Sequence, residues 1–193
     1  MTDSKKEMMR KICLYLGATL ILISVLVLAT WSISVNTAKK RMAERVDEIY
    51  SLIPEVQGAV PEERRDNTMA TLSLDKKDYV GVIEMPKFSS ALPVSTSWGR
   101  LTSSPSRYSG SAYDASLKIG ATTQKGQYDF YKEISVGDSV FFTDMEGNRF
   151  SYSISDIRYE NHIGSTELDK VDSSLTIFIK NIYGFEYMVI YCK

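Results

Sequence analysis

This chain of 193 residues is poor in cysteine and histidine and carries almost no net charge. It has two cysteines and one histidine, and its 23 basic and 24 acidic residues leave a formal net charge of −1. The balanced charge removes the case for nucleic-acid binding, which requires a basic surface. Cys13 lies at the edge of an apolar run and Cys192 is the penultimate residue, so we expect no disulfide between them.

Familiar catalytic and ligand-binding motifs are also missing. The chain contains no GxSxG, GxGxxG or CxxC motif, no phosphate-binding loop and no internal repeat. His162 is the available base and Cys192 the available thiol. We expect His162 to be a loop residue and Cys192 to be a small apolar residue at the end of a strand. Asp144, Glu146 and Asn148 offer a cation too few oxygens for an EF-hand, which favours an ordinary turn. We therefore expect no metal site and no cofactor.

A long apolar run near the N-terminus is the strongest feature that is present. Residues 12–35 contain no charged side chain. A helix of this length reaches about 36 Å, which exceeds the roughly 30 Å hydrocarbon core of a bilayer. Trp31 lies where an aromatic residue at the membrane interface is expected. The run favours an uncleaved single-pass anchor over a cleaved signal peptide, whose apolar region is normally shorter, and over a buried core helix.

Basic residues flank this run on both sides and leave its orientation open. The basic residues nearest to it are Lys5, Lys6, Arg10 and Lys11 before the run and Lys39, Lys40, Arg41 and Arg45 after it. Cytoplasmic flanks carry the excess of Lys and Arg in membrane proteins, and here that excess is nearly balanced. Charge alone therefore does not place the C-terminal domain inside or outside the cell.

The residues after the run predict a second helical segment and then a linker. Over 37–53, Met42, Val46, Ile49 and Leu52 or Ile53 recur at helical spacing, and Pro54 ends the pattern. Residues 57–67 contain glycine, proline and an EERRD charge run without periodicity, which is typical of a linker. The predicted organisation is an N-terminal segment (1–11), a transmembrane helix (12–35), a helical stalk and linker (36–70) and a β-rich domain (71–193).

Short strands dominate the rest of the chain. The expected strands cover residues 79–85, 117–120, 139–143, 150–155, 175–180 and 185–192. Residues 150–155 alternate strictly between apolar and polar, as half-buried strands do. Residues 144–148 form the turn of one hairpin, Tyr183-Gly184 the turn of a second, and 127–134 a short helix. This content predicts a mainly β fold, a small antiparallel or mixed barrel with one or two short helices.

Four stretches of the β-rich domain resemble a known family in their order and spacing. They are YVGVIEMP at 79–86 with LPV at 92–94, PSRYSGS at 105–111, GD at 137–138 with VFFTD at 140–144 and GN at 147–148, and LTIF at 175–178. Together they resemble the sortases, membrane-anchored cysteine transpeptidases of Gram-positive bacteria. The resemblance implies a sortase-like β-barrel outside the cell, with the N-terminus in the cytoplasm and a single pass through the cell membrane.

The resemblance does not extend to the catalytic residues. Sortases use a cysteine nucleophile, a histidine for proton transfer and an arginine that stabilises negative charge. The matching positions here hold Lys180, Thr122 and Tyr187. A threonine hydroxyl is not ionised near neutral pH, a lysine amine that attacked a peptide would leave a stable amide, and tyrosine brings no positive charge.

The resemblance therefore implies a catalytically degenerate surface protein. It would bind a sorting-signal peptide, a pilin or an active sortase without covalent transpeptidation. The candidate groove residues are Thr122, Thr176, Phe178, Lys180 and Tyr187. Strand periodicity places Thr176, Phe178 and Lys180 on one face. Two alternatives remain open: an active transpeptidase that uses Lys180, Tyr187 or Cys192, and a purely structural module of the cell surface.

Overall fold

The structure is a computed structural model whose described residues fall into two compact units. It describes residues 3–58, 67–96, 104–124, 126–168, 171–182, 184 and 186–193. The two units are Met1–Thr37 and Ala38–Lys193. Most of the predicted linker lies outside the described residues, as do Tyr183 of the second predicted turn and Phe185.

Helix α1 (Asp3–Leu52) contains the whole apolar run. Among the described residues it is the one helix long and apolar enough to cross a membrane. The large apolar side chains of the run are exposed, as at Leu20, Leu26 and Ile33, which argues against a buried core helix. The hydroxyls of Ser24 and Thr30 donate to carbonyls one turn earlier, at 2.9 and 3.0 Å, so these polar groups are satisfied within the helix.

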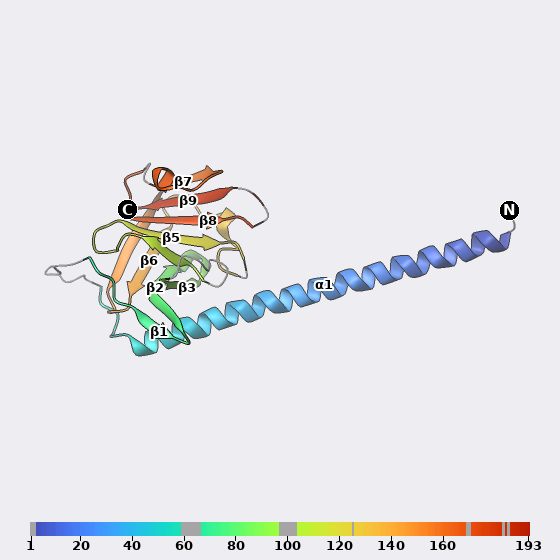
Figure 1. Cartoon of the computed structure of the whole chain (residues 1–193), viewed down its shortest axis with the longest axis horizontal. Helices are drawn as coiled ribbons and strands as arrows, with labels where there is room; N and C mark the ends of the chain where they lie inside the picture. The colour runs from blue at the N-terminus through green and yellow to red at the C-terminus, as the bar shows by residue number, and fades with distance from the viewer. Residues whose placement is uncertain are drawn as a thin grey trace. The chain divides into compact units, whose positions relative to one another are not determined.

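The second unit is a closed β-barrel with one added strand (Figure 1). Its strands are β1 (Leu72–Leu74), β2 (Lys77–Met85), β3 (Ser90–Ser95), β4 (Ser106–Ser109), β5 (Leu117–Thr122), β6 (Ser139–Asp144), β7 (Arg149–Glu160), β8 (Leu175–Lys180) and β9 (Tyr187–Cys192). The order around the barrel is β2-β3-β4-β5-β8-β9-β7-β6, and β6 pairs back to β2. Two pairings, β3–β4 and β5–β8, are parallel and the others antiparallel, which confirms the predicted mixed barrel.

The helix predicted over Gln127–Ile134 is wrong. The structure has successive turns there and a single 3-10 turn, η3 (Tyr131–Glu133). Tyr128 is buried in the barrel core, while Phe130 stacks on Phe88 of a second 3-10 turn, η1 (Pro86–Phe88), with ring centroids 4.3 Å apart. The rings of Tyr128 and Phe130 lie 5.6 Å apart, and side chains two residues apart do not meet on an α-helix, so this contact requires a different backbone.

The C-terminal turns of α1 belong to the barrel unit. Val46 and Ile49 are buried with Tyr79 and Val82 of β2. Beyond the helix, the Gln57 N–H donates to the carbonyl of Gly147 at 2.7 Å, and the Gln57 carbonyl accepts from the N–H of Arg149 at 3.0 Å. The region interpreted from the sequence as a stalk therefore includes residues that pack on the barrel, because the apolar stripe of the helix is buried there.

Barrel closure depends on a close approach at Gly81. This residue pairs with Asp144 of β6, and the ring of Phe142 lies against it. A β-carbon built on Gly81 would lie 2.4 Å from the Phe142 ring and 2.5 Å from the carbonyl oxygen of Thr143. Glycine is therefore required where β2 meets β6.

We predict that Ile49→Ala destabilises the barrel unit by about 2–5 kcal/mol, the usual cost of truncating a large core residue. Ile49 is fully buried, whereas Leu52 on the same helix is 56% exposed and provides the matched control. The measurement is urea unfolding of the full chain in detergent, followed by near-ultraviolet circular dichroism. Equal, small effects of Ile49→Ala and Leu52→Ala would show that the helix end does not stabilise the barrel.

We predict that Gly81→Ala destabilises the protein by about 1–3 kcal/mol through overpacking at the closing pair of strands. Gly58 has no heavy atom within 4 Å of a built β-carbon, so Gly58→Ala is the control and should change little. Thermal unfolding of the full chain in detergent measures both variants. A Gly81→Ala variant as stable as Gly58→Ala would contradict the close approach.

Candidate functional site

Strand register brings Thr122, Lys180 and Tyr187 together in one row. In the parallel pair β5–β8, Thr122 lies opposite Lys180, and in the antiparallel pair β8–β9, Lys180 lies opposite Tyr187. Their neighbours Ala121 and Ile179 belong to the barrel core, so the row lies on the outer face. Thr122 thus meets Lys180 and Tyr187 at one end of β5, β8 and β9, strands that lie side by side in Figure 1.

Thr122 is the buried member of this row. It is 3% exposed, and its hydroxyl accepts a hydrogen bond from the backbone N–H of Gln124 at 3.2 Å. Its own N–H donates to the side-chain carbonyl of Gln127 at 3.4 Å. The Thr122 side chain therefore shapes the turn after β5 and does not present a proton-transfer group to solvent.

Lys180 and Tyr187 form the accessible side of the row. Lys180 is exposed and Tyr187 is half-buried. The Lys180 ammonium lies 5.9 Å from the centroid of the Tyr187 ring, at the outer limit of a cation–π contact. The pair offers a positive charge and a phenol to a ligand, both able to donate hydrogen bonds to peptide carbonyl or carboxylate oxygens.

Thr176 and Phe178 share the outer face with Lys180 but do not line an open groove. Each is 1% exposed. The Phe178 ring packs edge-to-face on Tyr108 of β4, with centroids 5.6 Å apart, and is covered by Leu168 of the short helix α2 (Ser165–Leu168). Of the five groove residues expected from the sequence, two reach solvent and three are buried.

A pocket of about 330 Å³ opens at the same end of the barrel as the row. Its lining includes Ile179 and Asn181, which flank Lys180, and Glu186 and Met188, which flank Tyr187. Tyr131, Lys132 and Tyr159 complete the wall. Sequence reasoning missed these three residues because they come from η3 and β7, and only the closed barrel brings them to the row.

Cys192 and His162 lie outside the row. Cys192 is fully buried on the inner face of β9, within the barrel core. Burial raises the pKa of its thiol from 9.0 to about 12, so the thiol stays protonated and out of reach of a substrate. His162 is exposed in the segment after β7. A catalytic pair made from these two residues has no support in the structure.

The acidic turn at Asp144 is an ordinary hairpin turn, as predicted. The backbone N–H groups of Glu146 and Asn148 each donate to one Asp144 oxygen at 2.9 Å, and the Tyr113 hydroxyl donates to the other. Burial and the two neighbouring carboxylates, those of Asp144 and Glu146, raise the pKa of Tyr113 well above its usual range. Within the described part of the chain, no group of three or more His, Cys, Asp or Glu residues is placed to hold a metal ion.

Solved structures share this architecture. The pilus-related sortase C of group B Streptococcus is 16% identical over 83% of this chain and 93% of that chain, with a TM-score of 0.51. Sortase C1 of GBS pilus island 1 is 12% identical over 83% and 82%, with a TM-score of 0.52. Streptococcus pneumoniae sortase C is 13% identical over 86% and 95%, with a TM-score of 0.50.

No protein-family model and no curated protein matches the sequence. The solved structures, at these low identities, show the fold. The barrel unit has the sortase-like fold, as the resemblance implied.

We predict that Cys192 does not react with a maleimide at pH 7 in the folded protein and reacts after unfolding in urea. The test uses a Cys13→Ser background, because Cys13 is exposed. Adding Lys180→Cys to that background should create a rapidly labelled thiol, because position 180 is exposed. Mass spectrometry counts the labels, and rapid labelling of Cys192 in the folded chain would contradict its burial.

Burial of this thiol also predicts a pH dependence of stability. The thiol ionises near pH 9 when unfolded and only near 12 when folded, so its contribution is complete below about pH 9 and is lost as the pH rises toward 12. The Cys192→Ala variant lacks this thiol, so its free energy of unfolding should fall less as the pH rises above 9. Urea unfolding of the unmodified chain and of the Cys192→Ala variant at pH 7, 9 and 10 measures the difference.

Proposed function

We propose that this protein is a membrane-tethered, catalytically degenerate sortase-like module that binds an extended sorting-signal peptide without covalent chemistry. The observation that carries the proposal is the row of Thr122, Lys180 and Tyr187. It occupies the positions at which the resemblance places histidine, cysteine and arginine, and it contains a buried hydroxyl, an ammonium and a phenol instead.

The side chains of the row argue for binding rather than transpeptidation. Acyl transfer by a sortase needs a thiolate, and no thiol lies in the row. Lys180 is exposed beside an aromatic ring rather than desolvated in an apolar pocket, the setting that activates a lysine nucleophile. The buried Cys192 thiol does not replace it.

The accessible part of the site suits an extended peptide. Lys180 and Tyr187 would donate hydrogen bonds to peptide oxygens. The pocket of about 330 Å³ at the same end of the barrel, whose lining includes Ile179 and Met188, would accept an apolar side chain. The ligand would come from a pilin or another surface protein, or from a complex of such a protein with an active sortase. The pocket volume suits one or two side chains of such a segment.

The proposed location follows from the tether and the fold. The apolar run of α1 would anchor the chain in the cell membrane, with the N-terminus in the cytoplasm and the barrel outside. Sorting signals of secreted proteins would emerge on that side. The anchor would keep the barrel near them, which raises their effective concentration at the site.

We predict that a fluorescent sorting-signal peptide, chosen from surface proteins encoded in the same genome, binds the full chain in detergent reversibly. Lys180→Glu should weaken binding about fivefold or more, because charge reversal replaces attraction by repulsion. Lys76→Glu, an exposed lysine in the β1–β2 turn, is the matched control and should bind as the unmodified chain does.

Mass spectrometry of the same mixtures tests for chemistry. The expected result is intact peptide and no covalent adduct. Cleavage or transpeptidation that depends on Lys180, Tyr187 or Cys192 would make the protein an enzyme and overturn the proposal. Absence of binding to the whole peptide set would favour a structural module.

A further inference from the structure

The chain that follows β5, here named the β5–η3 segment (residues 123–130), is bonded directly to the row. The N–H of Thr123 donates to the carbonyl of Lys180 at 3.1 Å, and the N–H of Ile182 donates to the Thr123 hydroxyl at 3.3 Å. The hydroxyl of Thr122 accepts the N–H of the second residue of the segment at 3.2 Å. The first residues of the segment therefore hold the side chain of Thr122 and the backbone at and just after Lys180.

Burial holds the second half of the segment but not the first. Gln127 and Tyr128 are 0% and 1% exposed, and the Phe130 ring stacks on Phe88. None of the described residues before Gln127 in the segment belongs to the hydrophobic core, and all of them are half-buried. The position of this first half therefore depends on polar and surface contacts.

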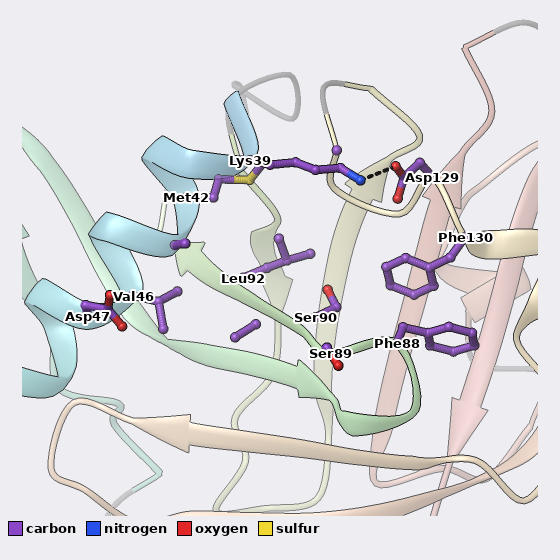
Figure 2. Close-up of a pocket in the computed structure, with 13 residues that line it drawn as sticks. Lys39, Met42, Val46, Asp47, Phe88, Ser89, Ser90, Leu92, Asp129 and Phe130 are labelled. Carbon is purple, nitrogen blue, oxygen red and sulfur yellow. Dashed lines mark ion pairs between the residues drawn. The ribbon is translucent and has the colours of Figure 1, made fainter. Parts of the chain in front are cut away.

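The side chain of Lys39 in α1 lies across the β5–η3 segment (Figure 2). Its ammonium pairs with the Asp129 carboxylate, with 2.6 Å between Nζ and Oδ2. Its methylene stem passes over Gly126, where a built β-carbon would lie 2.3 Å from Cγ and 2.7 Å from Cε of Lys39. Gly126 has a φ of +79°, which glycine adopts without strain. One lysine thus contacts the segment at two points, and Gly126 lies in the half that the core does not hold.

The helix offers Lys39 from a fixed support. Met42 follows Lys39 by three residues, so the two side chains lie on one face of α1. Met42 and Val46 are buried against the barrel, and with Leu92 they form the floor of a pocket of about 310 Å³ beside β3 (Figure 2). Lys39, Gly126 and Asp129 lie at the side of this pocket. The buried stripe of α1 therefore sets where the Lys39 stem begins.

We infer that Lys39 is a positioning residue for the proposed peptide site. Through Gly126 and Asp129 it holds the β5–η3 segment, and that segment holds Thr122 and the backbone at Lys180. The inference rests on the proposed function, because it assigns the regulation of the same site: the row binds peptide best while α1 is packed on the barrel. The Lys39 and Asp129 side chains are 47% and 44% exposed, so loss of the pair should loosen the segment locally and leave the barrel folded.

The first measurement is amide hydrogen exchange of the full chain in detergent, by nuclear magnetic resonance and without peptide. The amides of Thr123 and Ile182 report the bonds between the segment and the row. Lys39→Glu replaces attraction to Asp129 by repulsion and should speed exchange at both amides about threefold, the scale of an exposed ion pair. Circular dichroism checks that the variant is folded.

A matched control changes the same charge one residue further along. Lys40 pairs with Glu44 of the same helix at 3.7 Å and does not line the pocket. Lys40→Glu should therefore leave exchange at both reporter amides as in the unmodified chain. The double variant Lys39→Glu with Asp129→Lys restores the pair with reversed signs, and it should return the exchange rates to their original values.

The second measurement is the affinity of the same proteins for the fluorescent sorting-signal peptide. Lys39→Glu should weaken binding about two- to fivefold, while Lys40→Glu and the double variant should bind as the unmodified chain does. A purely structural role for Lys39 would lower the thermal unfolding midpoint and leave the peptide affinity of the folded protein unchanged.

Three results would overturn the inference. They are equal exchange rates in Lys39→Glu and Lys40→Glu, faster exchange in Lys39→Glu with unchanged peptide affinity, and no recovery in the double variant. If no sorting-signal peptide binds the unmodified chain, the proposed function fails, and the exchange measurement alone decides whether Lys39 holds the row. Peptide binding that is equal in all variants leaves the proposed function standing and removes the role of Lys39.

Discussion

The parallel pairing of β5 with β8 is the constraint on which the rest of the barrel depends. The two strands meet over six residue pairs, from Leu117–Leu175 to Thr122–Lys180. Parallel neighbours need a long crossover, and here the chain between them forms β6 and β7, which lie beyond β9 in the strand order, before it returns. The pairing therefore places the last third of the chain, and with it both Lys180 and Tyr187.

The same register decides which chemistry can reach solvent. Along β8 and β9, alternate residues point into the core or out of the barrel, so Ile179 and Met188 face inward while Lys180 and Tyr187 face outward. Cys192 falls on the inward set of β9. A shift of one residue would exchange the two sets and expose the apolar core. Cys192 also lies opposite Leu175, at the other end of β9 from Tyr187, so the fold keeps this thiol out of the row.

Much of this arrangement could be predicted from the sequence because its signals are local. The alternation of residues 150–155, the turn at Asp144 and the apolar run of α1 each specify an element without reference to the rest of the chain. The row of Thr122, Lys180 and Tyr187 could also be predicted, because the spacing from the sortase-like motifs indicated which residues end β5 and β8. These predictions rest on strand period and turn chemistry, which act over a few residues.

The failures all involve packing between distant segments. Thr176 and Phe178 have the periodicity of groove residues, but Leu168 of α2 covers Phe178, and no local pattern indicates that cover. The helix expected at 127–134 is overridden by Tyr128 and Phe130, whose rings lie 5.6 Å apart and pack in the same core cluster. The stripe of Met42, Val46 and Ile49 predicted a helix correctly but could not show that the barrel is what buries it.

The packing of α1 on the barrel also shapes the surface beside β3. The residues Met42 and Val46 that fasten the helix to the barrel also form the floor of the pocket beside β3. The row at Lys180 lies at the ends of other strands. A row without a thiol is compatible with the proposed binding role, since binding depends on the scaffold and the tether and not on turnover.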